Sequence, residues 1–262
     1  MTEDNREAAD KLLARTAQAH FAHLEKFGRV GSPALWKVQK QNILRDVRRL
    51  VEWHVQKLTG WRAAYTEVPF GAAGGEPEPP GRREPIILKT PHGEVRIRGR
   101  IDRIDLADGE PPTCQVIDYK TGGGPSPKDM QEGTSFQLPI YLWAAEALLA
   151  GCGPGLRQRA FFLPIRHPRQ SALVASHDSK GKPSPKFQAA LDRAATYIAR
   201  FVDAMRLGLY PVYPRGACGA PCDFEGLCRY TEWQIARKWE SHPIPQLDVI
   251  ADEPEGDEEA DA

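Results

Sequence analysis

The order of hydrophobic patterns along the chain limits the folds that it can adopt. Apolar residues recur at helical spacing in two N-terminal segments, and strand-like alternation follows before the helical pattern returns. We expect helices at 5–27, 35–58, 136–150 and 185–207, and strands at 61–70, 86–89, 94–106, 114–120 and 160–165. This order predicts an α/β fold, with a mixed central sheet flanked by helices rather than a doubly wound parallel sheet.

The chain divides into four expected regions. They are N-terminal helices at 1–60, a sheet-containing core at 61–207, a cysteine-containing segment at 208–240 and an acidic, disordered tail at 241–262. The 262 residues, 41% of them hydrophobic, suit one large domain with appendages. The charged start lacks the apolar run of a signal peptide, and no stretch is apolar enough to cross a bilayer. We therefore expect a cytoplasmic protein without a membrane partner.

The formal net charge of zero conceals an asymmetry between the tail and the rest of the chain. Seven of the 35 acidic residues lie between Asp252 and Asp261, where there is no Lys or Arg, so the remaining chain carries a charge of +7. A basic body favours a polyanionic partner such as DNA. Candidates for phosphate contacts are Arg96, Arg98, Arg100, Arg103, Lys128 and Arg166, although solvated surface charges would give the same pattern.

Two expected strands carry polar residues at positions suited to metal chemistry. Asp118 and Lys120 are two residues apart, so they share one face of their strand, and a turn near Asp108 can bring Asp102 of the preceding strand beside them. Two carboxylates suit Mg²⁺ or Mn²⁺, which can activate water for phosphodiester hydrolysis. The lysine would orient that water and offset charge on the phosphate. A surface salt-bridge ladder is the alternative for this pattern alone.

The sequence motifs that surround these residues favour a metal site over a surface salt-bridge ladder. The segments GRIDRID, IDYKTG and QLPIYLWA, in this order and spacing, resemble the nuclease domain of the RecB and AddB type. That type belongs to the PD-(D/E)XK superfamily, which also includes iron–sulfur nucleases of CRISPR adaptation. The resemblance covers about residues 20–229 and implies a restriction-endonuclease-like fold, DNA cleavage and a helicase subunit or domain as a partner.

The resemblance assigns roles to individual residues. It implies that Asp102 and Asp118 bind the metal and that Lys120 serves catalysis beside them. It also implies that Gln137 and Tyr141, four residues apart on one helix face, contact DNA or orient Lys120. His20 and Glu67 match further metal-binding positions, although Thr16 stands where the family has glycine before the histidine. Of the basic candidates, Arg100, Arg103 and Lys128 are the ones that we expect to contact DNA.

The five cysteines include three that crowd together near the C-terminus. Cys218, Cys222 and Cys228 resemble part of the [4Fe–4S] site of AddB-type nucleases, and thiolates are the usual ligands of such clusters. The family's fourth cysteine lies before the first helix, where this chain has none, so the cluster would be incomplete here. Truncation of the chain is the interpretation that we favour, while zinc binding, another fourth ligand and unmetallated thiols stay open.

Three functions fit these observations. The first is an active exonuclease domain of an AddB-like or RecB-like DNA-repair helicase–nuclease, acting on a single strand. The second is a stand-alone exonuclease of the CRISPR-adaptation type. The third is a non-catalytic DNA-binding scaffold, against which the intact Asp102, Asp118 and Lys120 argue.

Overall fold

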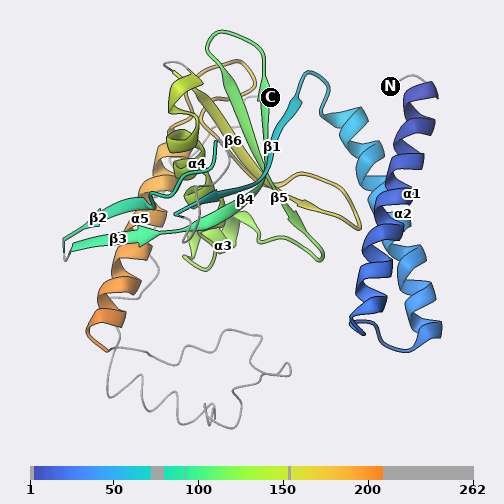
Figure 1. The fold of residues 1–262 in the computed structure, drawn as a ribbon. Coiled ribbons are helices and arrows are strands. Elements are labelled where there is room, and N and C mark those ends of the chain that lie inside the picture. The colour runs from blue at the N-terminus through green and yellow to red at the C-terminus, as the bar shows by residue number, and fades with distance from the viewer. Residues whose placement is uncertain (1–2, 72–79, 92, 153–154, 209–262) are drawn as a thin grey trace, which may run out of the picture.

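The computed structural model describes residues 3–71, 80–91, 93–152 and 155–208. Its longer helices and strands follow the order that the sequence predicts, whereas the short helix Pro127–Gln131 and the strand Ser171–Ala175 were not expected (Figure 1). The helices are α1 (Glu3–Lys26), α2 (Pro33–Lys57), α3 (Pro127–Gln131), α4 (Gln137–Leu148), the short 3₁₀ helix η1 (Ala150–Cys152) and α5 (Pro185–Arg206). The strands are β1 (Arg62–Phe70), β2 (Ile86–Thr90), β3 (Gly93–Ile97), β4 (Gly99–Ala107), β5 (Thr113–Lys120), β6 (Arg157–Pro164) and β7 (Ser171–Ala175).

Five strands form a mixed sheet, which confirms the expected fold class. The strand order is β1-β4-β5-β6-β7, and all neighbours are antiparallel except β5 and β6. A parallel pair needs a crossover, and here the segment containing α3 and α4 supplies it. The crossover places α4 over the two strands that it joins. Strand β7 was not predicted, because its five residues are too short to give a clear periodicity.

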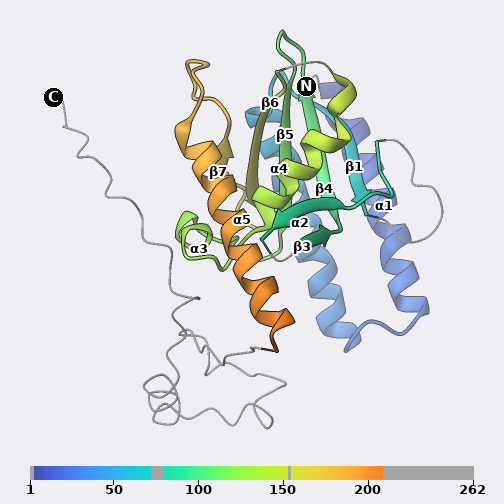
Figure 2. The same ribbon diagram turned by 90° about the vertical axis from the view of Figure 1, so that its left-hand side faces the viewer.

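The sheet has a different hydrophobic cluster on each face. Val116 and Phe162 belong to the larger cluster, which packs against α4 and α5, and both are fully buried. On the opposite face, Ile117 and Phe161 pack with Leu58 and with side chains of α2. Both views show the sheet between α1 and α2 on one side and α4 and α5 on the other (Figures 1 and 2). Strand β5 is therefore covered on both faces, and this explains its apolar character.

The N-terminal helices form a hairpin that contacts the sheet through α2. Ser32 and Pro33 start α2, where proline is tolerated because the first helical N–H needs no partner within the helix. Between the helices, Trp36 packs edge-on against Phe21 at 5.5 Å and donates a hydrogen bond to Glu25 at 2.6 Å. None of the described helices is long and apolar enough to span a membrane.

The expected strand at 94–106 is divided in two. Residues 93–97 pair with β2 in a separate ribbon, whereas residues 99–107 enter the main sheet beside β1 and β5. The division falls at Arg98, just before Gly99, which packs so closely against the Phe70 ring that a Cβ at this position would lie 2.7 Å from it. Val95, Ile97 and Ile101 keep one alternation across this point, so the sequence hides the change of pairing partner.

Candidate active site

Strand β5 carries a carboxylate and an ammonium group at its end. Asp118 and Lys120 share the face that α4 covers, and Lys120 Nζ lies 2.6 Å from Asp118 Oδ2. The Asp118 side chain is almost completely buried, whereas that of Lys120 keeps a quarter of its surface exposed. The Lys120 ammonium also lies 5.1 Å from the centre of the Phe162 ring, an arrangement that favours the cation. Both charged groups are therefore held at the margin of the core.

Asp102 of β4 lies beside this pair. The register that pairs Arg103 with Ile117 brings Asp102 next to Asp118 on the neighbouring strand. The main-chain N–H of Tyr119 donates to Asp102 Oδ2 at 2.9 Å, so β5 itself holds the second carboxylate. Burial is the main cause of the raised pKa of Asp118, and the charge of Asp102 adds a smaller contribution. The two acids therefore repel each other across the strand pair, and a cation would relieve this repulsion.

Gln137, the first residue of α4, connects the acid to the lysine. Its side-chain oxygen accepts a hydrogen bond from Lys120 Nζ at 2.6 Å, and its nitrogen donates to Asp118 Oδ1 at 2.5 Å. The same nitrogen lies 3.0 Å from the hydroxyl of Tyr141, one helical turn further along. The amide thus fixes the relative positions of the two charged groups of β5.

Burial raises the pKa of Asp118, and the hydrogen bond from Lys120 opposes this rise only in part. Its Oδ2 atom is buried without a well-directed hydrogen bond from the described residues, although the ion pair with Lys120 is close. Burial also raises the pKa of Tyr141, which therefore keeps its proton. A buried carboxylate oxygen next to a second acid suits a hard divalent cation, which takes oxygen ligands.

The donor set is compatible with Mg²⁺ or Mn²⁺ but small. Asp102 and Asp118 supply two carboxylates, and Mg²⁺ is commonly held by one or two carboxylates together with water and substrate phosphate. Across 3–71, 80–91, 93–152 and 155–208, no three His, Cys, Asp or Glu side chains come together as a metal-binding group. The site therefore fits a metal that retains open positions for water and substrate.

The two other expected metal ligands lie outside this cluster. His20 has an exposed side chain on α1. Glu67 is also exposed, pairs with Arg100 at 3.6 Å and has a φ of 53°, a left-handed conformation that is uncommon for a residue other than glycine. Its register position between Thr66 and Val68 puts it opposite Asp102 on β4. Glu67 is thus next to the carboxylate cluster, with its side chain in an ion pair.

The expected DNA-binding residues have different surroundings. Arg100 is exposed beside Glu67 on β1, and Lys128 is exposed on the short helix α3, 3.6 Å from Glu132. Arg103 is mostly buried, and its guanidinium donates to Asp105 at 2.5 and 3.1 Å and to the Tyr119 hydroxyl at 3.1 Å. Its charge is therefore directed at a buried carboxylate rather than at solvent.

A second polar cluster, which the sequence did not reveal, lies behind the site. Asp105 and Gln115 are fully buried on β4 and β5, and the Gln115 amide donates to Asp105 at 2.7 Å. Arg159 of β6 donates to Gln115 at 2.9 Å and stacks over the Trp61 ring at 4.4 Å. A glutamine within the apolar run of β5 was the available signal. This cluster fixes the strands that carry Asp102 and Asp118.

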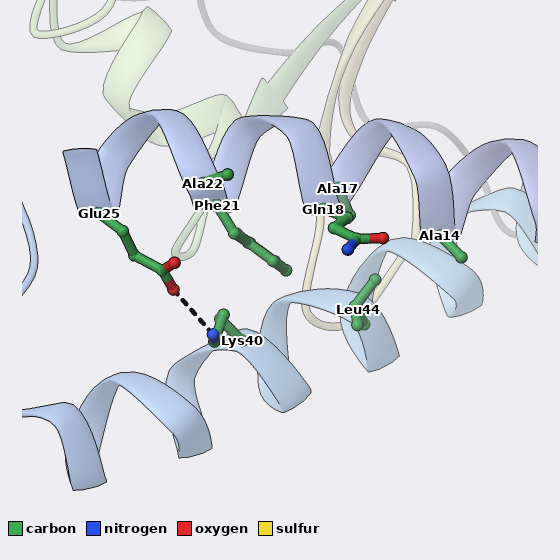
Figure 3. Close-up of a pocket in the computed structure, with 8 residues that line it drawn as sticks. All are labelled: Ala14, Ala17, Gln18, Phe21, Ala22, Glu25, Lys40 and Leu44. Atoms are coloured by element: carbon green, nitrogen blue, oxygen red, sulfur yellow. Dashed lines mark hydrogen bonds and ion pairs between the residues drawn. The ribbon is translucent and has the colours of Figure 1, made fainter. Parts of the chain in front are cut away.

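A pocket lined by three alanines and by larger side chains such as Phe21 and Leu44 lies elsewhere, between α1 and α2 (Figure 3). Its polar groups include Glu25 and Lys40, which form an ion pair at 2.8 Å. None of the site residues described above, and not His20, lines this pocket. It is a gap in the helical hairpin, separate from the carboxylate cluster.

The cysteine cluster predicted near the C-terminus lies outside the described residues, since Cys218, Cys222 and Cys228 all follow residue 208. Cys114 is fully buried in the core of β5.

Comparisons with known proteins agree with the geometry. The model of the PD-(D/E)XK nuclease superfamily matches residues 1–229. The chain is 30% identical over 167 residues to a subunit of the ATP-dependent helicase/deoxyribonuclease of Latilactobacillus sakei, covering 60% of this chain and 13% of that protein. It is 33% identical over 146 residues to the corresponding subunit from Symbiobacterium thermophilum, covering 50% and 12%. The chain thus spans about an eighth of the length of these relatives.

Proposed function

Because this chain belongs to the PD-(D/E)XK nuclease superfamily, we propose that it is a metal-dependent DNA nuclease equivalent to the nuclease part of an AddB-type helicase–nuclease. The observation that carries the proposal is the joining of Asp102, Asp118, Lys120 and Gln137 where the central strand β5 ends beside the start of β4. A helicase partner is part of the proposal, as are DNA repair and a cytoplasmic location. An exonuclease that acts on a single strand is the form that we favour.

Each residue has a defined task in this scheme. Asp102 and Asp118 would hold Mg²⁺ or Mn²⁺, which supplies charge neutralisation and lowers the pKa of bound water. Lys120 orients the attacking water and offsets negative charge that develops on the phosphate. Gln137 keeps Lys120 beside Asp118, and Tyr141 supports the Gln137 amide. Arg100 and Lys128 are proposed to contact phosphates.

Two further metal ligands and a cluster complete the proposal. His20 and Glu67 are proposed as additional metal ligands on the basis of the sequence resemblance. His20→Gln and Glu67→Gln variants should then raise the Mn²⁺ concentration needed for half-maximal cleavage. Cys218, Cys222 and Cys228 are proposed to supply three thiolate ligands of a [4Fe–4S] cluster. Iron and sulfide analysis after anaerobic purification tests this.

Cleavage of linear DNA by the purified chain tests the central proposal. We expect degradation of labelled single strands with Mg²⁺ or Mn²⁺ but none with a chelator, and we expect loss of cleavage in Asp118→Ala. Asp108→Ala is the matched control, because Asp108 is an exposed acid in the turn between the same two strands. If neither metal supports cleavage, or if Asp118→Ala retains it, the chain is not the proposed nuclease. Circular substrates distinguish exonuclease from endonuclease action.

A further inference from the structure

A row of arginines alternates with apolar residues along the approach to Asp102. Arg96, Arg98 and Arg100 are all exposed, whereas Ile97 packs against the core and Ile101 is fully buried. Alternate residues of an extended chain face the same way, at a spacing of about 6.6 Å. The three arginines therefore occupy alternate exposed positions from β3 to the start of β4, and about 20 Å of extended chain separates Arg96 from Asp102.

Close backbone contacts hold this row in place where β3 passes into β4. Gly71 has a φ of 67°, and a Cβ added there would lie 2.6 Å from the Cβ of Arg98. Gly99 packs directly against Phe70 in the same way. At the other end of the row, Arg206 of α5 donates to the main-chain oxygen of Glu94 at 2.8 Å. The row is thus attached to the core at both ends rather than carried on a free hairpin.

Much of the positive charge on this row is not neutralised by the part of the chain that the structure describes. Among those residues, no acidic side chain lies within ion-pair distance of Arg96 or Arg98. Arg100 pairs with Glu67 at 3.6 Å, but both side chains are more than 60% exposed, so solvent weakens the pair. Next to Arg96 on the ribbon, Ile87 exposes half of its surface. Exposed cations beside an exposed apolar side chain favour a ligand that has both phosphates and bases.

We propose that Arg96, Arg98 and Arg100 bind successive phosphates of a single DNA strand that runs along β3 and β4 toward Asp102. This inference rests on the proposed nuclease function, and it adds the path by which the substrate reaches the site. A single line of cations fits one phosphate backbone, whereas a duplex presents two backbones. Exposed Ile87 would contact a base of the bound strand.

Binding measured without divalent metal tests the track separately from cleavage. The probe is a labelled single strand of about 16 nucleotides, near the upper end of known site sizes for single-strand-binding folds. Its fluorescence anisotropy is followed with the full chain in chelator over a range of salt concentrations. The Arg96→Gln/Arg98→Gln variant is compared with Arg48→Gln/Arg49→Gln, which removes two charges from α2. Thermal unfolding of each variant establishes that it is folded.

We expect the row variant to raise the dissociation constant roughly tenfold and to reduce the salt slope by about 1.4, the value for two lost single-strand phosphate contacts. The α2 variant should keep the wild-type slope. Equal losses in both variants would show only general charge attraction and would overturn the track. An equal loss for a duplex of the same length would overturn its single-strand character. Wild-type slope in the row variant, combined with loss of cleavage in Asp118→Ala, would reject the track while leaving the nuclease function intact.

Discussion

The side-chain nitrogen of Gln137 lies 2.5 Å from Asp118 Oδ1, so a helix N-terminus and a strand end share one hydrogen bond in the candidate site. The oxygen of the same amide accepts from Lys120. One neutral side chain therefore holds both the carboxylate of Asp118 and the ammonium of Lys120 in place. A carboxylate in its place could still accept from the lysine, but it would repel the acid.

This geometry predicts that two substitutions of Gln137 have different effects on cleavage, one on its rate and the other on its pH dependence. Gln137→Leu removes both hydrogen bonds, and we expect cleavage to slow by roughly 100-fold, as for loss of one preorganised polar contact in other active sites. Gln137→Glu keeps the bond to Lys120 but adds a charge that raises the pKa of Asp118 further. Its pH–rate profile should therefore lose activity at a higher pH than that of the wild type on the acid side.

Exposed Gln188 provides the control, since it bonds only to Asp192 on α5 among the described contacts. Gln188→Leu should retain wild-type rates. Equal pH profiles for Gln137→Glu and the wild type would mean that the amide does not act on Asp118.

The raised pKa of Asp118 predicts that ionisation of this carboxyl group lowers the free energy of unfolding. A carboxyl group whose pKa is raised by folding favours the protonated form in the folded state, so its stabilising contribution is present at low pH and is lost as pH rises through the raised value. Asp118→Asn should therefore unfold at a higher temperature than the wild type at neutral pH without metal, by about 2–4 °C for each kcal/mol. The difference should shrink as pH falls. A lower melting temperature for the variant at pH 7 would contradict this.

Local periodicity was sufficient to predict which of the proposed site residues share a face, whereas the choice of these residues came from the family resemblance. Two-residue spacing put Asp118 and Lys120 on one face, and four-residue spacing put Gln137 and Tyr141 on one side of α4. Short-range rules of this kind need no knowledge of tertiary pairing. They also explain why β1 and β5 were predicted close to their observed positions, whereas β4 was merged with β3.

The buried polar cluster behind the site depends on tertiary pairing, and its members could not be predicted from the sequence. Gln115 and Asp105 are buried together because β4 and β5 pair in one particular register and α2 covers that face. The apolar run around Gln115 signals its burial, but it does not identify Asp105 and Arg159 as its partners. The same limitation applies to Arg103, which the sequence suggested for phosphate contact and whose guanidinium is bound to Asp105.

Asp105→Asn tests the buried cluster. The change preserves shape but removes the charge that faces the Arg103 guanidinium, whose side chain is only 15% exposed. Breaking a buried pair at one partner commonly costs about 3–5 kcal/mol, so we expect a clear fall in urea stability. Asp108→Asn, in the exposed turn of the same hairpin, should change stability by less than about 0.5 kcal/mol. Similar effects of the two changes would show that the Asp105 charge is not important for the fold.

The buried imidazole of His54, which lies between α2 and the sheet, leads us to predict how the stability of the protein changes in acid. Burial, with a contribution from the Arg103 charge, lowers the pKa of His54 to about 4, and its Nε2 lies 3.2 Å from the Tyr119 hydroxyl. The folded protein thus keeps this imidazole neutral at pH values where the unfolded chain binds a proton. Stability should then be lost as pH falls from about 6.5 toward 4.

His54→Gln should remove part of this loss, on the order of 1–2 kcal/mol because the ring is only partly buried and solvent screens its charge. Urea unfolding at pH 7 and pH 5 measures it, with exposed His20→Gln as the control. If His54→Gln loses as much stability between these pH values as the wild type does, another group controls the acid response.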